Sequence, residues 1–244
     1  AMLDEGKILP TTLVPDIPTI INDFSPKNFS RDYDGAVGAD NALVRSLNVP
    51  AVHMLRAYRY EKFHSLLKGI GITTLRFSPD HYGLSLILGG AEGTLWDIAG
   101  AYASMGRTTL NFFERPGKNR YTRSDFHALK YLASETTEHT DTTHELENSS
   151  WLSASAIYQT FNVLTELYRP GEESGWRHFD SSKKIAWKTG TSYGRRDAWS
   201  VGYNKNYTIG VWVGNFSGVG VADLSGANVA TPLLFKIFNT VDYD

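Results

Sequence analysis

The chain has 244 residues, of which 41% are hydrophobic and 20% are charged, so it can bury a substantial core in one domain or two subdomains. Its 24 basic and 26 acidic residues are interspersed, which argues against nucleic acid or an anionic membrane surface as the partner. The chain has no cysteine, which excludes disulfides and thiolate metal sites, and no apolar stretch approaches the ~18 residues of a membrane span.

The N-terminal part predicts an extended connection followed by short helices. Residues 10–34 are rich in Pro, Asn, Asp and Ser, which is typical of an irregular segment. A short helix capped by its first residue is expected over Asp40–Leu47, and Pro50 is expected to open the next one at its first position. A third helix has a phenylalanine and two leucines on one face and is expected to stop at Gly69 or Gly71.

Two longer helices follow in the sequence. Thr94 and Asp97 resemble a capping box that begins a helix ending at Gly106. Ser153 is expected to cap a second helix, which Pro170-Gly171 ends.

The C-terminal part predicts strands. Three apolar, β-prone runs at 185–191, 198–203 and 207–216 are expected to form an antiparallel meander. The glycine-rich segment 214–226 lacks the ending of a phosphate loop and is expected to connect the last strand to a closing helix that begins at Thr231. Helices first and a strand meander last indicate an α+β fold.

The tetrad Lys188-Thr189-Gly190-Thr191 lies in the first of these strands. A strand edge with a cation and two hydroxyls can hold a carboxylate, while Gly190 removes the side chain that would keep a ligand from the backbone. The bare tripeptide Lys-Thr-Gly also occurs by chance in many proteins.

A second polar motif, Ser46-Leu47-Asn48, falls between two predicted helices, just before Pro50. Short polar side chains at such a junction can point into a cleft. The same residue types are common helix caps, so this motif alone carries little weight.

Four stretches resemble, in the same order, the transpeptidase domain of class A penicillin-binding proteins: YDGAVGADNALVRSLNVPAV, LILGGAEGTLWDIAGAYASM, KIAWKTGTSYGRRDAWSVGY and YTIGVWVGNFSG. The run around the tetrad is most like the 1C type. The resemblance extends from about Leu3 to Phe238 and weakens over 112–150. It implies one partial domain over residues 1–244 with a β-lactamase/transpeptidase-like α+β fold, in which helices flank an antiparallel sheet and a helical subdomain adjoins it.

The resemblance also implies a reaction. In this family a serine attacks the penultimate D-Ala carbonyl of a peptidoglycan stem peptide, and the amine of a neighbouring stem peptide resolves the acyl-enzyme. Carried onto this chain, Ser46 would relay a proton and Asn48 would bind the substrate's amide oxygen. Lys188 would keep the site positive, Thr189 and Thr191 would bind the terminal carboxylate, and the Thr191 N–H would be an oxyanion donor.

The family's first motif, Ser-x-x-Lys, lies shortly before a helix end that resembles residues 2–10, so we expect the nucleophile upstream of Ala1 and the domain to be N-terminally incomplete. Two other matches, Ser65–Lys68 and Ser181–Lys184, are out of the family's order and are interpreted as coincidences. Removing a serine nucleophile costs on the order of 10⁶ in kcat, so we expect the chain as given to be inactive as a transpeptidase.

The same resemblance predicts that the last strand, 207–216, lacks its neighbour, and an exposed apolar strand edge favours a homodimer. The expected ligands are stem peptides and β-lactams, with no cofactor and no metal. The parent protein is expected to be anchored in the membrane, with this domain outside the cytoplasm. Two alternatives stay open: a non-catalytic binding or scaffold module, and a related D,D-carboxypeptidase or β-lactamase-like hydrolase.

Other candidate residues have structural explanations. His139 and His144 lie in the polar segment 134–150, where a solvated loop is favoured over a metal site because no third ligand has useful spacing. The segment Arg195–Asp197 either lines the cleft or forms a polar hairpin loop. A stripe of aromatic residues is interpreted as sheet packing: Trp199, Tyr203, Tyr207 and Trp212.

Overall fold

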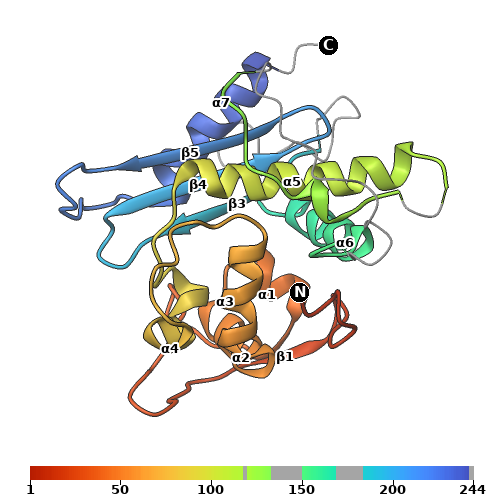
Figure 1. Cartoon of the computed structure of the whole chain (residues 1–244). Helices are drawn as coiled ribbons and strands as arrows, with labels where there is room; N and C mark the ends of the chain where they lie inside the picture. Colours follow the sequence, from red (N-terminus) through yellow and green to blue (C-terminus); the bar gives the residue numbers. More distant parts are fainter. Residues whose placement is uncertain (118–119, 133–149, 169–183, 242–244) are drawn as a thin grey trace.

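The computed structural model describes residues 1–117, 120–132, 150–168 and 184–241. In Figure 1 the N-terminal hairpin and helices α1 to α4 form a lower region, and a sheet with helices α5, α6 and α7 forms an upper one. The elements in chain order are β1 (Leu13–Asp16), β2 (Gly35–Gly38), α1 (Ala39–Val44), α2 (Asn48–Tyr58), α3 (Tyr60–Gly69), α4 (Pro79–Tyr82), η1 (Gly83–Leu88), α5 (Leu95–Glu114), η2 (Arg123–Asp125), α6 (Ala154–Thr165), β3 (Ala186–Thr191), β4 (Asp197–Tyr203), β5 (Thr208–Gly214), η5 (Gly226–Ala230) and α7 (Thr231–Val241).

The predicted meander is confirmed as an antiparallel sheet with the strand order β3-β4-β5. Lys188 lies opposite Val201, and Trp199 lies opposite Trp212. The last strand is shorter than predicted, since β5 spans Thr208–Gly214. Because β4 is central, both β3 and β5 are edge strands of this sheet.

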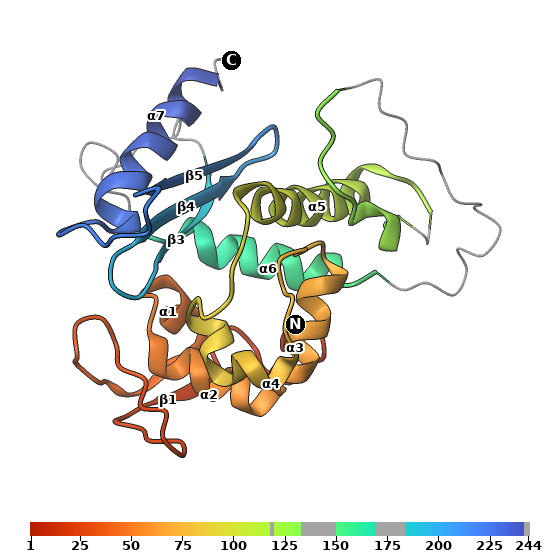
Figure 2. The same ribbon diagram turned by 60° about the vertical axis from the view of Figure 1, so that its left-hand side comes forward.

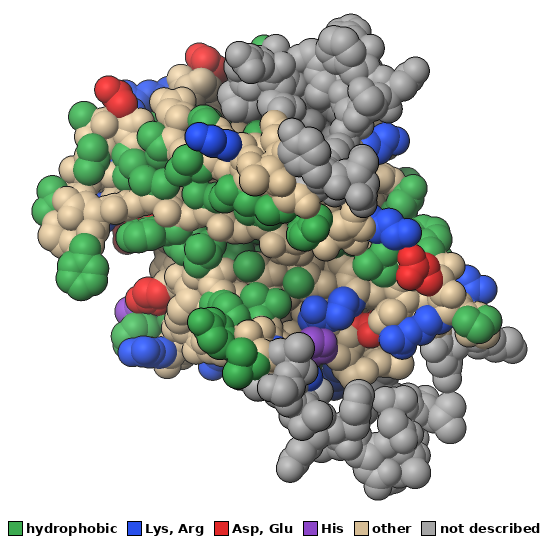
Figure 3. Space-filling model, turned by 90° about the horizontal axis from the view of Figure 1, so that it is seen from above, with side chains coloured by type: hydrophobic (Ala, Val, Ile, Leu, Met, Phe, Trp, Pro, Cys, Tyr) green, Lys and Arg blue, Asp and Glu red, His purple; other side chains and the backbone are tan. Residues whose placement is uncertain are grey.

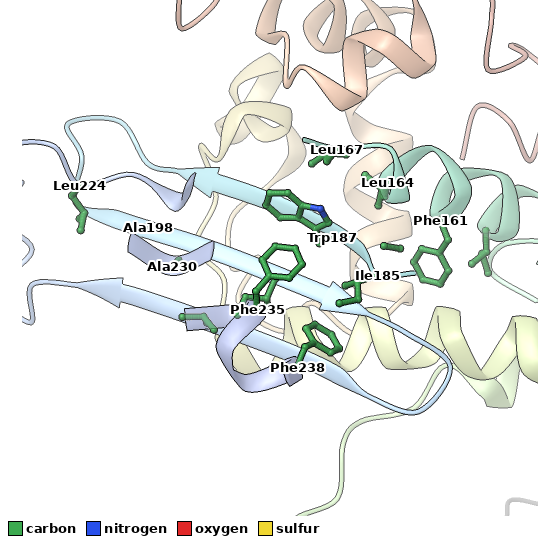
Figure 4. Packing of buried hydrophobic residues seen from close by; sticks show 14 of the residues in the cluster. Phe161, Leu164, Leu167, Ile185, Trp187, Ala198, Leu224, Ala230, Phe235 and Phe238 are labelled. Atoms are coloured by element: carbon green, nitrogen blue, oxygen red, sulfur yellow. The ribbon is translucent and has the colours of Figure 1, made fainter. Parts of the chain in front are cut away.

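The main core lies on both faces of the sheet. On one face α7 packs against β4 and β5, and the ring of its Phe235 lies 5.2 Å from that of Trp187 in β3 (Figure 4). On the other face Tyr203 of β4 stacks on Phe161 of α6 at 4.7 Å. Helix α6 also contacts β3 and α1, so it joins the sheet to the lower region (Figure 2).

Helix α5 does not stop at Gly106 but continues to Glu114, which corrects the predicted end. A Cβ at Gly106 would lie 2.2 Å from the Tyr203 ring, so this glycine lets the helix pass close to β4 instead of ending it. The predicted cap is half confirmed: Thr94 accepts a hydrogen bond from the Asp97 N–H at 3.0 Å, but the Asp97 carboxylate accepts from Thr73.

The N-terminal part is more regular than predicted, because residues 10–34 contain β1, which pairs with β2. Asp40 is not the cap of α1; the cap position is Gly38, and Asp40 lies in the first turn. Helix α1 ends at Val44, before the predicted end. Pro50 is the third residue of α2 rather than its first, a position that is tolerated because the first N–H groups of a helix have no intrahelical partner.

The other predicted boundaries are close to the observed ones. Helix α3 ends at Gly69, Ser153 caps α6 by accepting from the Ala156 N–H, and α7 begins at Thr231. Helix α6 ends at Thr165, and Pro170-Gly171 lies outside the described residues. Within the described ranges, no helix is both long and apolar enough to cross a membrane.

Candidate functional site

The open edge of β3 exposes backbone groups of the tetrad. Ser192 donates its N–H to the Asp197 carbonyl at 3.0 Å, just beyond the paired strands. Ser192 and Asp197 therefore form a hydrogen-bonded pair, and such pairs alternate with non-hydrogen-bonded pairs along an antiparallel ladder. Thr189 and Thr191 fall in the non-hydrogen-bonded pairs, so they direct their N–H and C=O groups away from β4. The Thr191 N–H, predicted to be an oxyanion donor, therefore lies on the unpaired side of the strand.

The side chain of Lys188 brings the two motifs together. Its ammonium donates hydrogen bonds to the Ser46 hydroxyl and, at 3.0 Å, to the Thr189 carbonyl. The Thr189 carbonyl is one of the groups on the open edge. Two motifs that are 142 residues apart in the chain therefore meet at this edge.

The backbone between α1 and α2 presents Ser46 to Lys188. Ser46 has a φ of 55°, a left-handed conformation that costs a non-glycine residue about 1–2 kcal/mol. It turns the chain so that the Leu47 N–H reaches the Ala42 carbonyl at 2.9 Å and the Leu47 side chain is buried. Ser46 itself is exposed.

The first residue of α2 is Asn48, and its side chain donates a hydrogen bond to the Lys27 carbonyl at 2.8 Å. An asparagine amide has two N–H donors. One of them is engaged by the protein, and among the described residues the other has no acceptor. Asn48 can therefore still donate to a ligand.

The electrostatics of Lys188 are those of a cation without a counter-ion. Burial lowers the pKa of the Lys188 amine from 10.5 to about 8, because the charged form loses solvation. Its two hydrogen-bond partners are neutral, and within the described part of the chain it forms no ion pair. This arrangement favours an anionic ligand.

The C-terminal end of β3 is covered by the segment after β5. Gly226 donates its N–H to the Thr191 hydroxyl at 3.0 Å. A Cβ at Gly226 would lie 2.4 Å from the Trp199 carbonyl oxygen and 2.6 Å from that of Gly190, so only glycine allows this approach. The sequence pattern of 214–226 predicts only a connection and does not single out Gly226, although its glycine-rich composition is the available signal.

Comparison with known proteins finds relatives over most of the chain. It is 34% identical over 237 residues to penicillin-binding protein 1C of Escherichia coli K12, an alignment that covers 97% of this chain and 27% of that protein. It is 30% identical over 220 residues to penicillin-binding protein 1F of Bacillus subtilis 168, covering 87% and 28%. The chain belongs to the penicillin-binding proteins. It spans just over a quarter of the length of these two relatives, and no family model matches it.

Solved penicillin-binding protein structures share the fold. Penicillin-binding protein 1A from Haemophilus influenzae superposes with a TM-score of 0.70 at 18% identity, over 97% of this chain and 40% of that one. PonA1 from Mycobacterium tuberculosis in complex with penicillin V gives 0.64 at 18% identity, over 94% and 63%. The expected β-lactamase/transpeptidase-like α+β fold is thereby confirmed.

In this penicillin-binding protein the segment Arg195–Asp197 lies where the β3–β4 hairpin turns into β4, and its contacts stabilise that hairpin. Arg195 pairs with Asp223 at 3.2 Å, and the Asp197 carboxylate accepts from the Trp212 indole at 3.0 Å. The first contact ties the β3–β4 loop to the segment after β5, and the second joins the start of β4 to β5. Trp212 also packs on Trp199 at 6.4 Å, as sheet packing predicts.

Of the remaining candidates, only Ser65 lies among the described residues, and it is engaged within its own helix. Ser65 donates its hydroxyl to the Glu61 carbonyl of its own helix at 3.0 Å, and α3 packs against α2 and α4. Ser181, His139 and His144 lie outside the described residues.

Proposed function

We propose that this chain forms the carboxylate-binding side of a penicillin-binding D,D-transpeptidase site that recognises D-Ala-D-Ala stem peptides and β-lactams. The observation that carries the proposal is Lys188, a half-buried cation on an open strand edge, in contact with Ser46 and without a carboxylate among its described neighbours. An anion at this place would offset the cost of the unpaired charge.

On this proposal each group has the role that the family relationship implies. The terminal carboxylate of the ligand binds beside Lys188, with the Thr189 and Thr191 hydroxyls as donors, and Gly190 keeps the strand narrow between them. The Thr191 N–H on the open edge stabilises the carbonyl oxygen under attack. Ser46 passes a proton between the leaving amine and the catalytic lysine, and Asn48 donates its second N–H to the substrate's amide oxygen.

We propose that the nucleophile is none of the serines considered above. Ser46 belongs to the second motif, and Ser65 is engaged within α3. On this proposal the chain binds ligands without being acylated, while the parent enzyme carries out serine acyl transfer.

Peptide binding tests the carboxylate site. Acetyl-Lys-D-Ala-D-Ala is titrated into the ¹⁵N-labelled chain, and the expected chemical shift changes centre on 188–191 and on Ser46. The same peptide with a C-terminal amide is the control and is expected to bind at least ten times more weakly, since it lacks the carboxylate. Equal binding of both peptides contradicts the proposal and leaves a scaffold module as the better interpretation.

Intact mass after incubation with benzylpenicillin tests the nucleophile separately. No covalent adduct is expected. An adduct on any serine would instead indicate an active carboxypeptidase or β-lactamase-like hydrolase.

We also propose a homodimer through β5. The Asn204 N–H donates to the Tyr207 carbonyl, so these two residues form a hydrogen-bonded pair next to the β4–β5 ladder. Hydrogen-bonded and non-hydrogen-bonded pairs alternate along an antiparallel ladder. Every second residue of β5 therefore directs its backbone groups away from β4: Thr208, Gly210, Trp212 and Gly214. β5 is the uppermost strand in Figure 1, and the view from above in Figure 3 shows many hydrophobic side chains on that side. A free edge beside apolar surface is a template for pairing with a second chain.

The family relationship also supports a place outside the cytoplasm, as part of a membrane-anchored parent protein. A reporter enzyme that is active only outside the cytoplasm, fused after the parent's C-terminus, is expected to be active. An inactive fusion with normal expression contradicts this location.

A further inference from the structure

We propose that Asp16 and Asn28 are positioning residues for Ser46 and Asn48. This inference rests on the proposed function, because it assigns their role to the same site. Both side chains are almost fully buried, with 0% and 2% of their surface exposed. Buried polar side chains are costly unless they are hydrogen-bonded, so their partners indicate what they do.

Asn28 fixes the start of α2. Its Oδ1 accepts a hydrogen bond from the Val49 N–H at 3.1 Å, so it satisfies one of the free N–H groups of that helix from 21 residues away. Its amide group donates to Asp16 Oδ1 at 2.7 Å and to the Asp32 carbonyl at 2.9 Å. Both amide hydrogens and the oxygen are therefore used.

Asp16 extends the network to the other side of Ser46. Its second oxygen accepts from the Asp34 N–H at 3.0 Å. The Asp34 carboxylate forms an ion pair with Arg45, the residue that directly precedes Ser46, and raises the pKa of that guanidinium. The network thus holds the chain on both sides of the Ser46-Leu47-Asn48 motif.

The same segment contacts the motif directly. Lys27, the neighbour of Asn28, accepts the hydrogen bond from the Asn48 side chain. Ser46 has the left-handed backbone described above, and such a conformation persists only where the surroundings determine it. Asp16 and Asn28 supply those surroundings, and they keep the Ser46 hydroxyl within reach of Lys188.

The test measures the titration of Lys188 without any ligand. The chain is labelled with ¹³Cε-lysine, and the Lys188 signal is assigned from the Lys188→Arg variant. In the unchanged chain it is expected to titrate at about 8. In Asn28→Ala the junction loosens, water reaches the amine, and the midpoint is expected to move up by about one unit or more toward 10.5.

A matched control separates positioning from general loss of stability. Leu75 is buried in a different cluster of the same region, with Leu55, Tyr82 and Leu86. Leu75→Ala is expected to lower the thermal midpoint at least as much as Asn28→Ala while leaving the Lys188 titration unchanged.

Swapping the aspartate and the asparagine between positions 16 and 28 provides a rescue experiment for the Lys188 titration. Asn28→Asp places two carboxylates face to face and is expected to shift Lys188 as Asn28→Ala does. Adding Asp16→Asn restores a donor between the two side chains, while the carboxylate introduced at position 28 still accepts from the Val49 N–H. The bond to the Asp32 carbonyl is lost, and a carboxylate oxygen then faces that carbonyl oxygen. The double variant is therefore expected to recover part of the original titration.

The proposal is overturned if Lys188 titrates at about 8 in Asn28→Ala and Asn28→Asp, or if Leu75→Ala shifts it equally. Failure of the proposed function has a different signature. In that case the unchanged chain does not bind acetyl-Lys-D-Ala-D-Ala, whereas the Lys188 titration still reports on Asp16 and Asn28.

Discussion

Gly226 donates its backbone N–H to the hydroxyl of Thr191, 35 residues earlier in the chain, at an N···O distance of 3.0 Å. This bond fastens the segment after β5 to the end of β3 that carries the tetrad. It also orients the Thr191 hydroxyl, because that oxygen acts as acceptor toward Gly226 while its own hydrogen can still be donated. The two threonines of the tetrad therefore differ in what they do for the protein itself.

Thr191→Val tests this difference. The buried Gly226 N–H loses its acceptor, so the free energy of unfolding is expected to fall by about 1–2 kcal/mol. Thr189→Val is the matched control, since the Thr189 hydroxyl has no hydrogen-bond partner in the described part of the chain, and its effect on stability is expected to stay within about 0.5 kcal/mol. Both variants are expected to weaken peptide binding. Equal stability of the two in urea unfolding contradicts the assignment.

Gly226→Ala is expected to disrupt the end of β3. The new methyl group would collide with two backbone carbonyl oxygens, which cannot move aside as a flexible side chain could, so we expect a loss of about 3 kcal/mol or more. Gly218→Ala changes the same connecting segment where there is open space, so its cost comes only from the positive φ of 72° and is expected to be about 1–2 kcal/mol. Thermal unfolding of both variants checks the order, and a smaller effect at Gly226 would argue against the close approach.

The pKa of Lys188 predicts a pH dependence of ligand binding. Only the charged amine attracts a carboxylate, and the terminal carboxylate of the peptide is ionised above about pH 5. The affinity for acetyl-Lys-D-Ala-D-Ala is therefore expected to be constant between about pH 5 and 7 and to fall as the pH rises above about 8. Calorimetric titrations across this range measure the effect. The amidated peptide is the control, and a similar fall for both peptides would point to a different titrating group.

Lys188 also predicts a pH dependence of stability, with the opposite sign to that of an ordinary salt-bridged lysine. Its pKa is lower in the folded chain, so between about 8 and 10.5 the unfolded chain holds more protons and stability rises with pH. Lys188→Met removes the cost of the charge and is expected to stabilise the chain by about 1–2 kcal/mol at neutral pH, a value reduced for partial screening by water. This gain should disappear by about pH 10.5 in urea unfolding.

Thr208→Pro tests the homodimer. Thr208 directs its N–H away from β4, so proline there leaves the sheet intact and removes one donor from the free edge. Analytical ultracentrifugation is expected to show a concentration-dependent dimer that weakens several-fold in this variant. Thr208→Val keeps the N–H and should behave like the unchanged chain. A monomer at high concentration in all three would rule out pairing through β5.

The sequence was sufficient to predict the meeting of Ser46 and Lys188, because motif order and flanking residues carry over within a family. The strand positions also followed from apolar runs. The predicted end of α5 at Gly106 and the predicted cap of α1 at Asp40 were wrong for a common reason. Local rules treat glycine as a stop and aspartate as a cap, whereas here packing on Tyr203 and the β1–β2 hairpin determine the backbone.

The supporting residues of the site could not be predicted in this way. Asn28 and Gly226 act through hydrogen bonds to residues 21 and 35 positions away, and no periodicity or spacing in the sequence connects them to the motifs. Each of these two bonds has a backbone N–H as its donor, and a backbone N–H leaves no mark in the pattern of residue types. Such roles become visible only when the chain is folded.

Trp187 directly precedes Lys188 and gives the site strand a built-in chromophore. Its indole is 3% exposed, packs edge-on against Phe235, and its N–H has no acceptor among the described residues. An indole in dry, apolar surroundings emits at shorter wavelength than one in water, so the difference between the spectra of the unchanged chain and Trp187→Phe isolates this one emitter among six tryptophans. The binding of a ligand to β3 beside Trp187 can then be followed through the fluorescence of this tryptophan, without an added label.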